Sequence, residues 1–160
     1  MPDEMMGEQM PGWMMSGGQM MDAEMMEDMR VIHVLLTNHD RIRRSVQDIA
    51  TGVRARTTSA GPEIAELIRT HAGQMKERVE QGHTIRPMDP VFREIFEHHD
   101  EIEMEVDRVA GGVLVVETSP NPQVELLVRQ HAHRAVSEFV ADGMARAMRP
   151  TPLPAGYREN

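Results

Sequence analysis

Apolar residues recur at intervals of three and four positions along two stretches of the chain that lie 60 residues apart. This interval places the apolar side chains on one face of an α-helix, so each stretch predicts an amphipathic helix. The two helices are expected to end before Gly52 and Gly112, because glycine commonly terminates a helix. The stripe positions are Leu35, His39, Ile42, Val46 and Ile49 in the first stretch and Ile95, His99, Ile102, Val106 and Val109 in the second.

A short strand and a second helix are predicted after each of these helices. Residues 53–57 and 112–116 have the alternating or apolar pattern of a short strand. Pro62 and Pro122 follow at the start of the second helices, where proline is favoured. The apolar stripes of these helices are Ile64, Leu67, Ile68, His71, Met75 and Val79, and then Val124, Leu127, Val128, His131, Ala135 and Phe139.

The two halves of the pattern are copies of one unit, because residues 31–81 align with residues 91–141 without a gap. Two histidines, a glycine and a proline are among the residues that stay identical in register. One unit cannot easily bury its own apolar faces, so the two are expected to pack about a pseudo-two-fold axis. The predicted fold class is mainly α (α+β), with two helix-strand-helix repeats forming a four-helix core beside a small two-stranded antiparallel sheet.

The repeats define the expected domain organisation. Residues 1–29 form a Met-rich arm that is flexible or partly helical. Residues 30–148 form a single domain, in which the proline-containing segment 82–90 connects the two repeats. Residues 149–160 are expected to form a Pro-rich tail without periodicity.

Composition narrows the range of partners. The net charge of −9 argues against a nucleic-acid partner, which would require a basic stripe. No apolar run approaches the length of a membrane span. The chain has no cysteine, so a metal or catalytic centre would have to use His, Met, Asp and Glu.

The repeated histidines are the leading candidates for a metal site. His39, His71, His99 and His131 each fall on the apolar stripe of a different predicted helix. Imidazoles buried without partners are costly, and a shared metal ion would satisfy them together. An all-imidazole set suits Cu, Zn, Fe or Ni, with affinity favouring copper. Met75 is a further candidate ligand, and its replacement by Ala135 in the second repeat makes the site asymmetric.

Three other interpretations of these residues stay open. His71 and His131, with Met75 as an alternative axial ligand, would suit a non-covalently bound haem. His99 and Glu103 are similar to part of a hemerythrin-like di-iron centre, which would make the protein a redox protein or an enzyme. The histidines would otherwise only pack in the core of a structural or interaction module. His133 is a secondary candidate ligand, and whether the protein catalyses a reaction is left open.

Methionine is concentrated at the start of the chain, where residues 1–29 hold eleven of the sixteen methionines. Thioether sulfur is a soft ligand that suits Cu(I) when thiols are absent. Met21, Met25 and Met29 would share one face if this segment is helical. Adaptable core packing is the alternative role for such a face. The density favours metal capture, so the preferred function is a soluble copper-binding or copper-handling protein.

The layout resembles a group of uncharacterised, extracytoplasmic bacterial proteins. The resemblance is carried by the Met-rich N-terminus and by the repeated His39-Asp40, Gly52-Val53, Thr58-Ser59, Pro62 and His71 with their second-repeat partners. It implies a tandem helix-strand-helix layout and no particular activity. Cysteine-free metal handling favours the bacterial periplasm over the cytosol, and a homodimer is left open.

Overall fold

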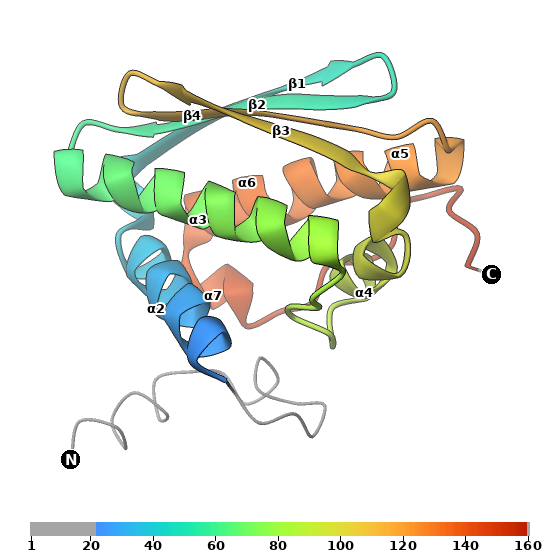
Figure 1. Cartoon of the computed structure of the whole chain (residues 1–160), viewed down its shortest axis with the longest axis horizontal. Coiled ribbons are helices and arrows are strands. Elements are labelled where there is room, and N and C mark those ends of the chain that lie inside the picture. Colours follow the sequence, from blue (N-terminus) through green and yellow to red (C-terminus); the bar gives the residue numbers. More distant parts are fainter. Residues whose placement is uncertain (1–21, 160) are drawn as a thin grey trace.

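A four-stranded antiparallel sheet with helices on one of its faces forms the frame of the protein (Figure 1). The structure, a computed structural model, describes residues 22–159. In chain order the elements are α2 (Ala23–Thr37), β1 (Ile42–Ile49), β2 (Gly52–Ser59), α3 (Pro62–Gln81), α4 (Pro90–Glu97), β3 (Glu103–Val109), β4 (Gly112–Thr118), α5 (Pro122–Gln130), α6 (Ser137–Asp142) and α7 (Met144–Ala147). Short 3₁₀ turns at His39–Arg41 and His99–Glu101 connect α2 to β1 and α4 to β3.

The two sequence repeats form two matching halves of the sheet. Each repeat contributes a helix, a β-hairpin and a long second helix, and the strand order is β1-β2-β4-β3. β2 and β4 meet antiparallel at the centre, with Gly52 opposite Thr118 and Thr58 opposite Gly112. This pairing relates the halves by a pseudo-two-fold axis that passes between β2 and β4. The strands predicted at 53–57 and 112–116 lie within this central pair.

The prediction of a four-helix core with a two-stranded sheet is wrong. The segments assigned to the C-terminal parts of the first helices are the edge strands β1 and β3, so the sheet has four strands. In β1 the inward-facing position between Ile42 and Val46 is the polar Arg44, which hides the alternation of a strand. The second repeat shows the alternation openly, because Ile102, Met104 and Val106 are separated by acidic residues.

Identical residues of the repeats hold the two halves together. Nδ1 of His39 donates to the Val140 carbonyl oxygen at 2.8 Å, and Nδ1 of His99 donates to the Val79 carbonyl oxygen at 2.8 Å. Each imidazole therefore binds a carbonyl near the end of the long helix in the other repeat. In the same crosswise manner Arg69 donates to the carbonyls of Val109 and Gly112, and Arg129 donates to those of Ile49 and Gly52.

A π-helical turn, His131–Val136, interrupts the long helix of the second repeat between α5 and α6. A π turn contains one residue more than the α-helical turn it replaces. The spacing between matching residues accordingly grows from 60, for His71 and His131, to 61, for Gly82 and Gly143. With this shift Val136 takes the place in the repeat that the sequence comparison gave to Ala135, as the counterpart of Met75.

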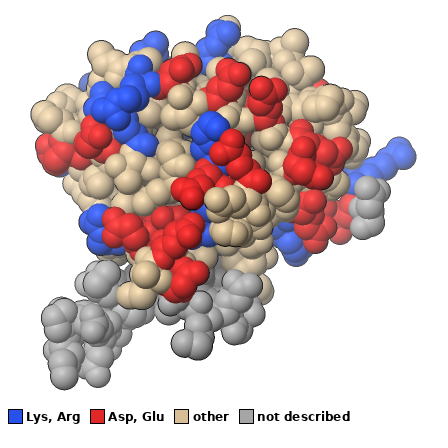
Figure 2. All heavy atoms as spheres, in the orientation of Figure 1, with Lys and Arg blue, Asp and Glu red and all other residues tan. Residues whose placement is uncertain are grey.

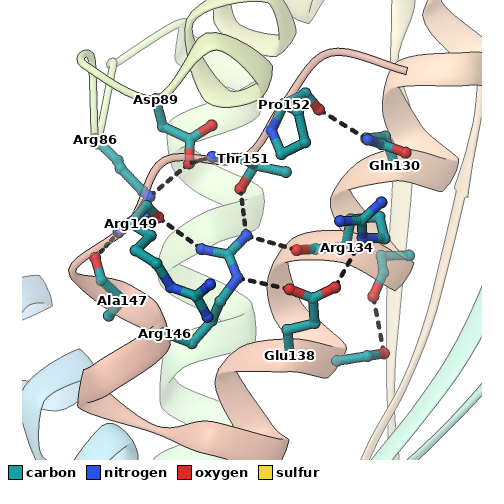
Figure 3. Close-up of polar contacts among 12 residues, drawn as sticks. Arg86, Asp89, Gln130, Arg134, Glu138, Arg146, Ala147, Arg149, Thr151 and Pro152 are labelled. Carbon is teal, nitrogen blue, oxygen red and sulfur yellow. Dashed lines mark hydrogen bonds and ion pairs between the residues drawn. The ribbon is translucent and has the colours of Figure 1, made fainter. Parts of the chain in front are cut away.

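The C-terminal segment packs against the domain through a buried polar network (Figure 3). Asp89 is fully buried and accepts from Arg86 Nε at 2.9 Å and from the backbone N–H of Thr151 at 2.8 Å. Arg86 also donates to the carbonyls of Ala147 and Arg149. Arg146 donates to Thr151 Oγ1 at 3.0 Å. The tail is thereby tied both to the start of α4 and to α7.

The described surface carries both signs of charge. Figure 2 shows acidic and basic side chains intermingled over one side of the molecule. Among the described residues, no helix combines the length and the apolar character that a membrane span would need.

Gly143→Ala is expected to lower the free energy of unfolding by about 1–3 kcal/mol. Gly143 has φ +66°, and an added Cβ would collide with the His39 ring that clamps the helix end. Gly73→Ala is the matched control, because this helical glycine has no atom within 4 Å of the added Cβ. In the control, the free energy of unfolding should rise by about 0.5–1 kcal/mol, because alanine has a better helix propensity than glycine. Urea denaturation measures both changes in stability. Equal changes in the two variants would contradict the role of His39 in holding the helix end.

Candidate functional site

A cavity of about 220 Å³ lies between the inner face of the sheet and the helices, where the two repeats meet. All four strands and both long helices contribute to its wall. Most of the lining is apolar, with Phe92, Phe96 and Phe139 as its aromatic side chains. The polar or charged residues of the wall are His39, Arg44, Thr57, His71, Arg86, Glu117 and His131.

The size of this cavity is itself informative. Protein cores are close-packed and contain few voids larger than a water molecule. A concave, mainly apolar space of this size with a few polar groups on its wall is typical of a site for a small molecule. The cavity is therefore the candidate binding site.

His71 and His131 are the matching pair of histidines on the cavity wall, one from each repeat. Nδ1 of each ring is enclosed and has no hydrogen-bond partner in the described part of the chain. The ring of Phe92 lies edge-on to His131, with centroids 5.0 Å apart. Since Nδ1 is sealed from the cavity, Nε2 is the nitrogen of each ring that can contact a molecule inside it.

Burial determines the charge state of both rings. Burial, together with the smaller effect of the nearby positive charge of Arg44, lowers the pKa of His71 and of His131 to about 4. Both imidazoles are consequently neutral at pH 7. The small part of each residue's surface that stays accessible lies where the residue lines the cavity. A neutral imidazole offers its Nε2 either as a hydrogen-bonding atom or as a metal ligand.

Arg44 and Glu117 are the two charged side chains that the sheet contributes to the cavity wall. Arg44 donates to Thr57 Oγ1 at 2.9 Å and to Ser137 Oγ at 3.1 Å, so it reaches from β1 to the first residue of α6. Burial raises the pKa of Glu117 to about 7, and the attraction of Arg44 offsets only part of this rise. Among described residues Glu117 has no hydrogen bond or ion pair. A carboxyl group that titrates near neutrality beside two neutral imidazoles is typical of a functional site.

Sequence reasoning missed Arg44 and Glu117, although the repeat comparison contains a signal for both. The counterpart of Arg44 is Met104, and the counterpart of Glu117 is Thr57. All four line the cavity, whereas other inward positions of the sheet stay apolar in both repeats. The two repeats thus differ in polarity on the inner face only at the positions of Arg44 and Glu117. Such a difference between the copies indicates a site to which the two repeats contribute different side chains.

The predicted ligands separate into two groups. His71, His131 and Met75 line the cavity together. His39 also borders the cavity, but its Nδ1 and that of His99 are used by helix carbonyls.

The secondary candidates lie elsewhere. His133 is on the surface, where it binds Asp48 at 2.7 Å, and Glu103 is exposed on β3. Met29 is buried in the core, and Met25 packs against the same cluster. Met21 lies outside the described residues. Within residues 22–159, three or more His, Cys, Asp or Glu side chains nowhere converge in a metal-binding group.

Comparisons with protein-family models, with curated proteins and with solved structures find no match to this chain. The fold and the cavity therefore define the protein only as a two-repeat α+β domain with a central, His-lined cavity.

Proposed function

We propose that this protein binds a small, mainly apolar molecule in the central cavity. The observation that carries the proposal is the 220 Å³ space at the junction of the repeats, walled by apolar side chains and by His71 and His131. An apolar cavity of about 150 Å³ suffices for benzene. Typical pockets for drug-sized ligands start at about 300 Å³. The expected ligand is thus somewhat larger than benzene.

The polar groups of the wall specify a hydrogen-bonding head group on that ligand. The two Nε2 atoms each supply one donor or one acceptor, according to tautomer. Glu117 supplies an acceptor when ionised and a donor when protonated, and its pKa of about 7 makes both forms available at neutral pH. A hydroxyl or amine group on an aromatic or branched apolar body matches this combination.

Binding of 4-methylphenol and of toluene, which lacks the hydroxyl, tests the proposal. We expect 4-methylphenol to raise the thermal unfolding temperature and to bind tighter than toluene by isothermal titration calorimetry. Each hydrogen bond to a neutral group typically contributes about 1 kcal/mol, so the preference should be about fivefold or more. The preference should disappear in His71→Leu/His131→Leu.

A cavity-filling variant controls for binding elsewhere on the protein. Ala132 is buried on the cavity wall beside His131, and Ala132→Leu fills part of the space. This variant should lose affinity for both probes, whereas the surface variant His133→Gln should keep it. Equal binding of both probes by the wild type and by Ala132→Leu would exclude the cavity as the site.

Copper binding is the second proposal, and one observation favours it. His71, His131 and Met75 line the same cavity, and Met104 adds a second thioether. Two neutral imidazoles with thioethers form a soft ligand set that suits Cu(I). Anaerobic titration with Cu(I) in the presence of a competing chelator should then give one tight site per chain. That site should be lost in His71→Leu/His131→Leu and retained in His133→Gln, which replaces an exposed ring.

The haem and di-iron alternatives have less support. The haem ligands proposed from sequence all line the cavity, but a porphyrin is much larger than 220 Å³ and would require the repeats to separate. A Soret band after haem addition, absent in the double histidine variant, is the result that would favour haem. For a di-iron centre, Glu103 is exposed on β3 while His99 binds the Val79 carbonyl.

A further inference from the structure

The outer face of the sheet carries opposite charges on its two halves. All helices of the described chain lie on the other face, so the outer face is uncovered by them (Figure 1). Because the cavity-lining side chains of the strands point inward, their sequence neighbours point outward. The exposed outward charges are Arg43, Arg54 and Arg56 on β1 and β2, and Glu103, Glu105 and Asp107 on β3.

These six charges make no ion pairs with one another or with any other described residue. Elsewhere on the surface, exposed charges do pair, as Arg108 does with Glu66 at 3.2 Å. Opposite charges that lie directly across adjacent strands would stabilise a sheet. Here the apolar outer side chains of β4, Leu114 and Val116, stand between the basic and acidic halves, and both are half-buried. The arrangement leaves both halves available to a partner.

The strand register aligns four of these six charges in two parallel rows. Arg54 lies opposite Val116, which lies opposite Glu105. In the next row Arg56 lies opposite Leu114, which lies opposite Asp107. Each row therefore reads basic, apolar, acidic across the sheet.

We propose that this outer face binds a second copy of the chain, sheet against sheet, about a two-fold axis that runs along β4. Such an axis reverses the order of the strands, so β2 of one copy faces β3 of the other. Arg54 and Arg56 of one copy then face Glu105 and Asp107 of the other copy. The apolar side chains of the two β4 strands pack against each other at the centre. An axis perpendicular to the strands would place basic halves on basic halves and is excluded by repulsion.

The two repeats differ at the outer face in the way this arrangement requires. Arg43 corresponds to Glu103 in the second repeat, and the outward Ser45 corresponds to Glu105. Arg54 corresponds to the apolar Leu114. A face that served only as solvated surface needs no such segregation, whereas a self-complementary interface needs one basic and one acidic half.

Sedimentation velocity of the full chain with two charge-reversed variants tests the proposal. The wild type should be dimeric at low salt, and its dissociation constant should rise as sodium chloride increases from about 0.05 M to about 0.5 M. Glu105→Arg/Asp107→Arg and Arg54→Glu/Arg56→Glu should each weaken the dimer at least tenfold, because each then faces like charges. An equimolar mixture of the two variants should restore a dimer, since each reversed half meets its opposite.

Asp40→Arg/Asp100→Arg is the matched control. These exposed acids lie in the 3₁₀ turns outside the sheet face, and their replacement changes the net charge as much as the acidic-row variant does. The control should remain dimeric. A monomeric wild type at low salt, dimers that persist in both reversed variants, or a mixture that stays monomeric would each overturn the proposal.

Discussion

Asp89→Ala is expected to lower the free energy of unfolding by about 3–5 kcal/mol, the largest effect of any single substitution that we predict. The Asp89 carboxylate is fully buried and accepts four hydrogen bonds. Two come from the first N–H groups of α4, so the residue is also the N-cap of that helix. Its removal would leave the Arg86 guanidinium buried beside α4 without its carboxylate.

Urea denaturation measures this loss, and Asp142→Ala supplies the control. Asp142 is an exposed acid at the end of α6, and its replacement should change stability by less than about 0.5 kcal/mol. Asp89→Asn should fall between the two, because the amide keeps an acceptor for α4 but loses the charge that balances Arg86. A loss below about 1 kcal/mol in Asp89→Ala would show that the C-terminal network contributes little.

The second large effect is an acid-induced loss of stability that depends on the two cavity histidines. Burial lowers the pKa of His71 and of His131 to about 4, from an ordinary value of 6.5. The unfolded chain therefore binds protons that the folded chain does not, and stability falls as the pH drops below 6.5 towards 4. At pH 5 each of the two imidazoles should lower the free energy of unfolding by an amount on the order of 2 kcal/mol.

Comparison of denaturation at pH 7 and pH 5 checks this prediction. The decrease in the free energy of unfolding from pH 7 to pH 5 should be about 4 kcal/mol smaller in His71→Leu/His131→Leu than in the wild type. His133→Gln, which replaces an exposed ring, should leave the loss unchanged. An equal acid loss in the wild type and in the double variant would show that other groups cause it.

Glu117 should act in the opposite direction. Its folded pKa of about 7 lies above the ordinary 4.5, so the folded state holds its proton more tightly. The wild type should consequently lose stability as the pH rises from 4.5 through 7. Glu117→Gln should lack this loss, and a ligand that donates a hydrogen bond to the carboxylate should reduce it.

The duplication was predictable from sequence because identical residues occur at constant spacing, and the structure gives many of them a definite role. His39, His99, Arg69 and Arg129 bind backbone carbonyls across the junction of the repeats. The same comparison could not separate these clamping histidines from the cavity pair. Both pairs fall on the same apolar periodicity, and only the tertiary structure shows which nitrogens are already bonded.

The secondary structure of the first half of each repeat was misassigned for a local reason. Ile42 and Val46 are four residues apart and fit both a helical stripe and one face of a strand, whereas Ile49 fits only the helical stripe. The inward Arg44 removed the alternation that would have indicated a strand. The sequence comparison likewise did not detect the extra residue of the π turn. An insertion within a helix changes only the spacing of the matching residues that follow it, which here are Val79 with Val140 and Gly82 with Gly143.

The sequence by itself showed that the chain repeats one unit, predicted that the two units pack about a pseudo-two-fold axis, and placed two histidines of each unit on the faces expected to meet there. Periodicity and repetition are properties of neighbouring residues, so they survive in a linear chain. Only the tertiary structure decided that the core is hollow, that Arg44 and Glu117 enter it, and that charge is segregated on the outer sheet. Those features depend on which strands lie side by side, and strand order is set by contacts between residues far apart in sequence.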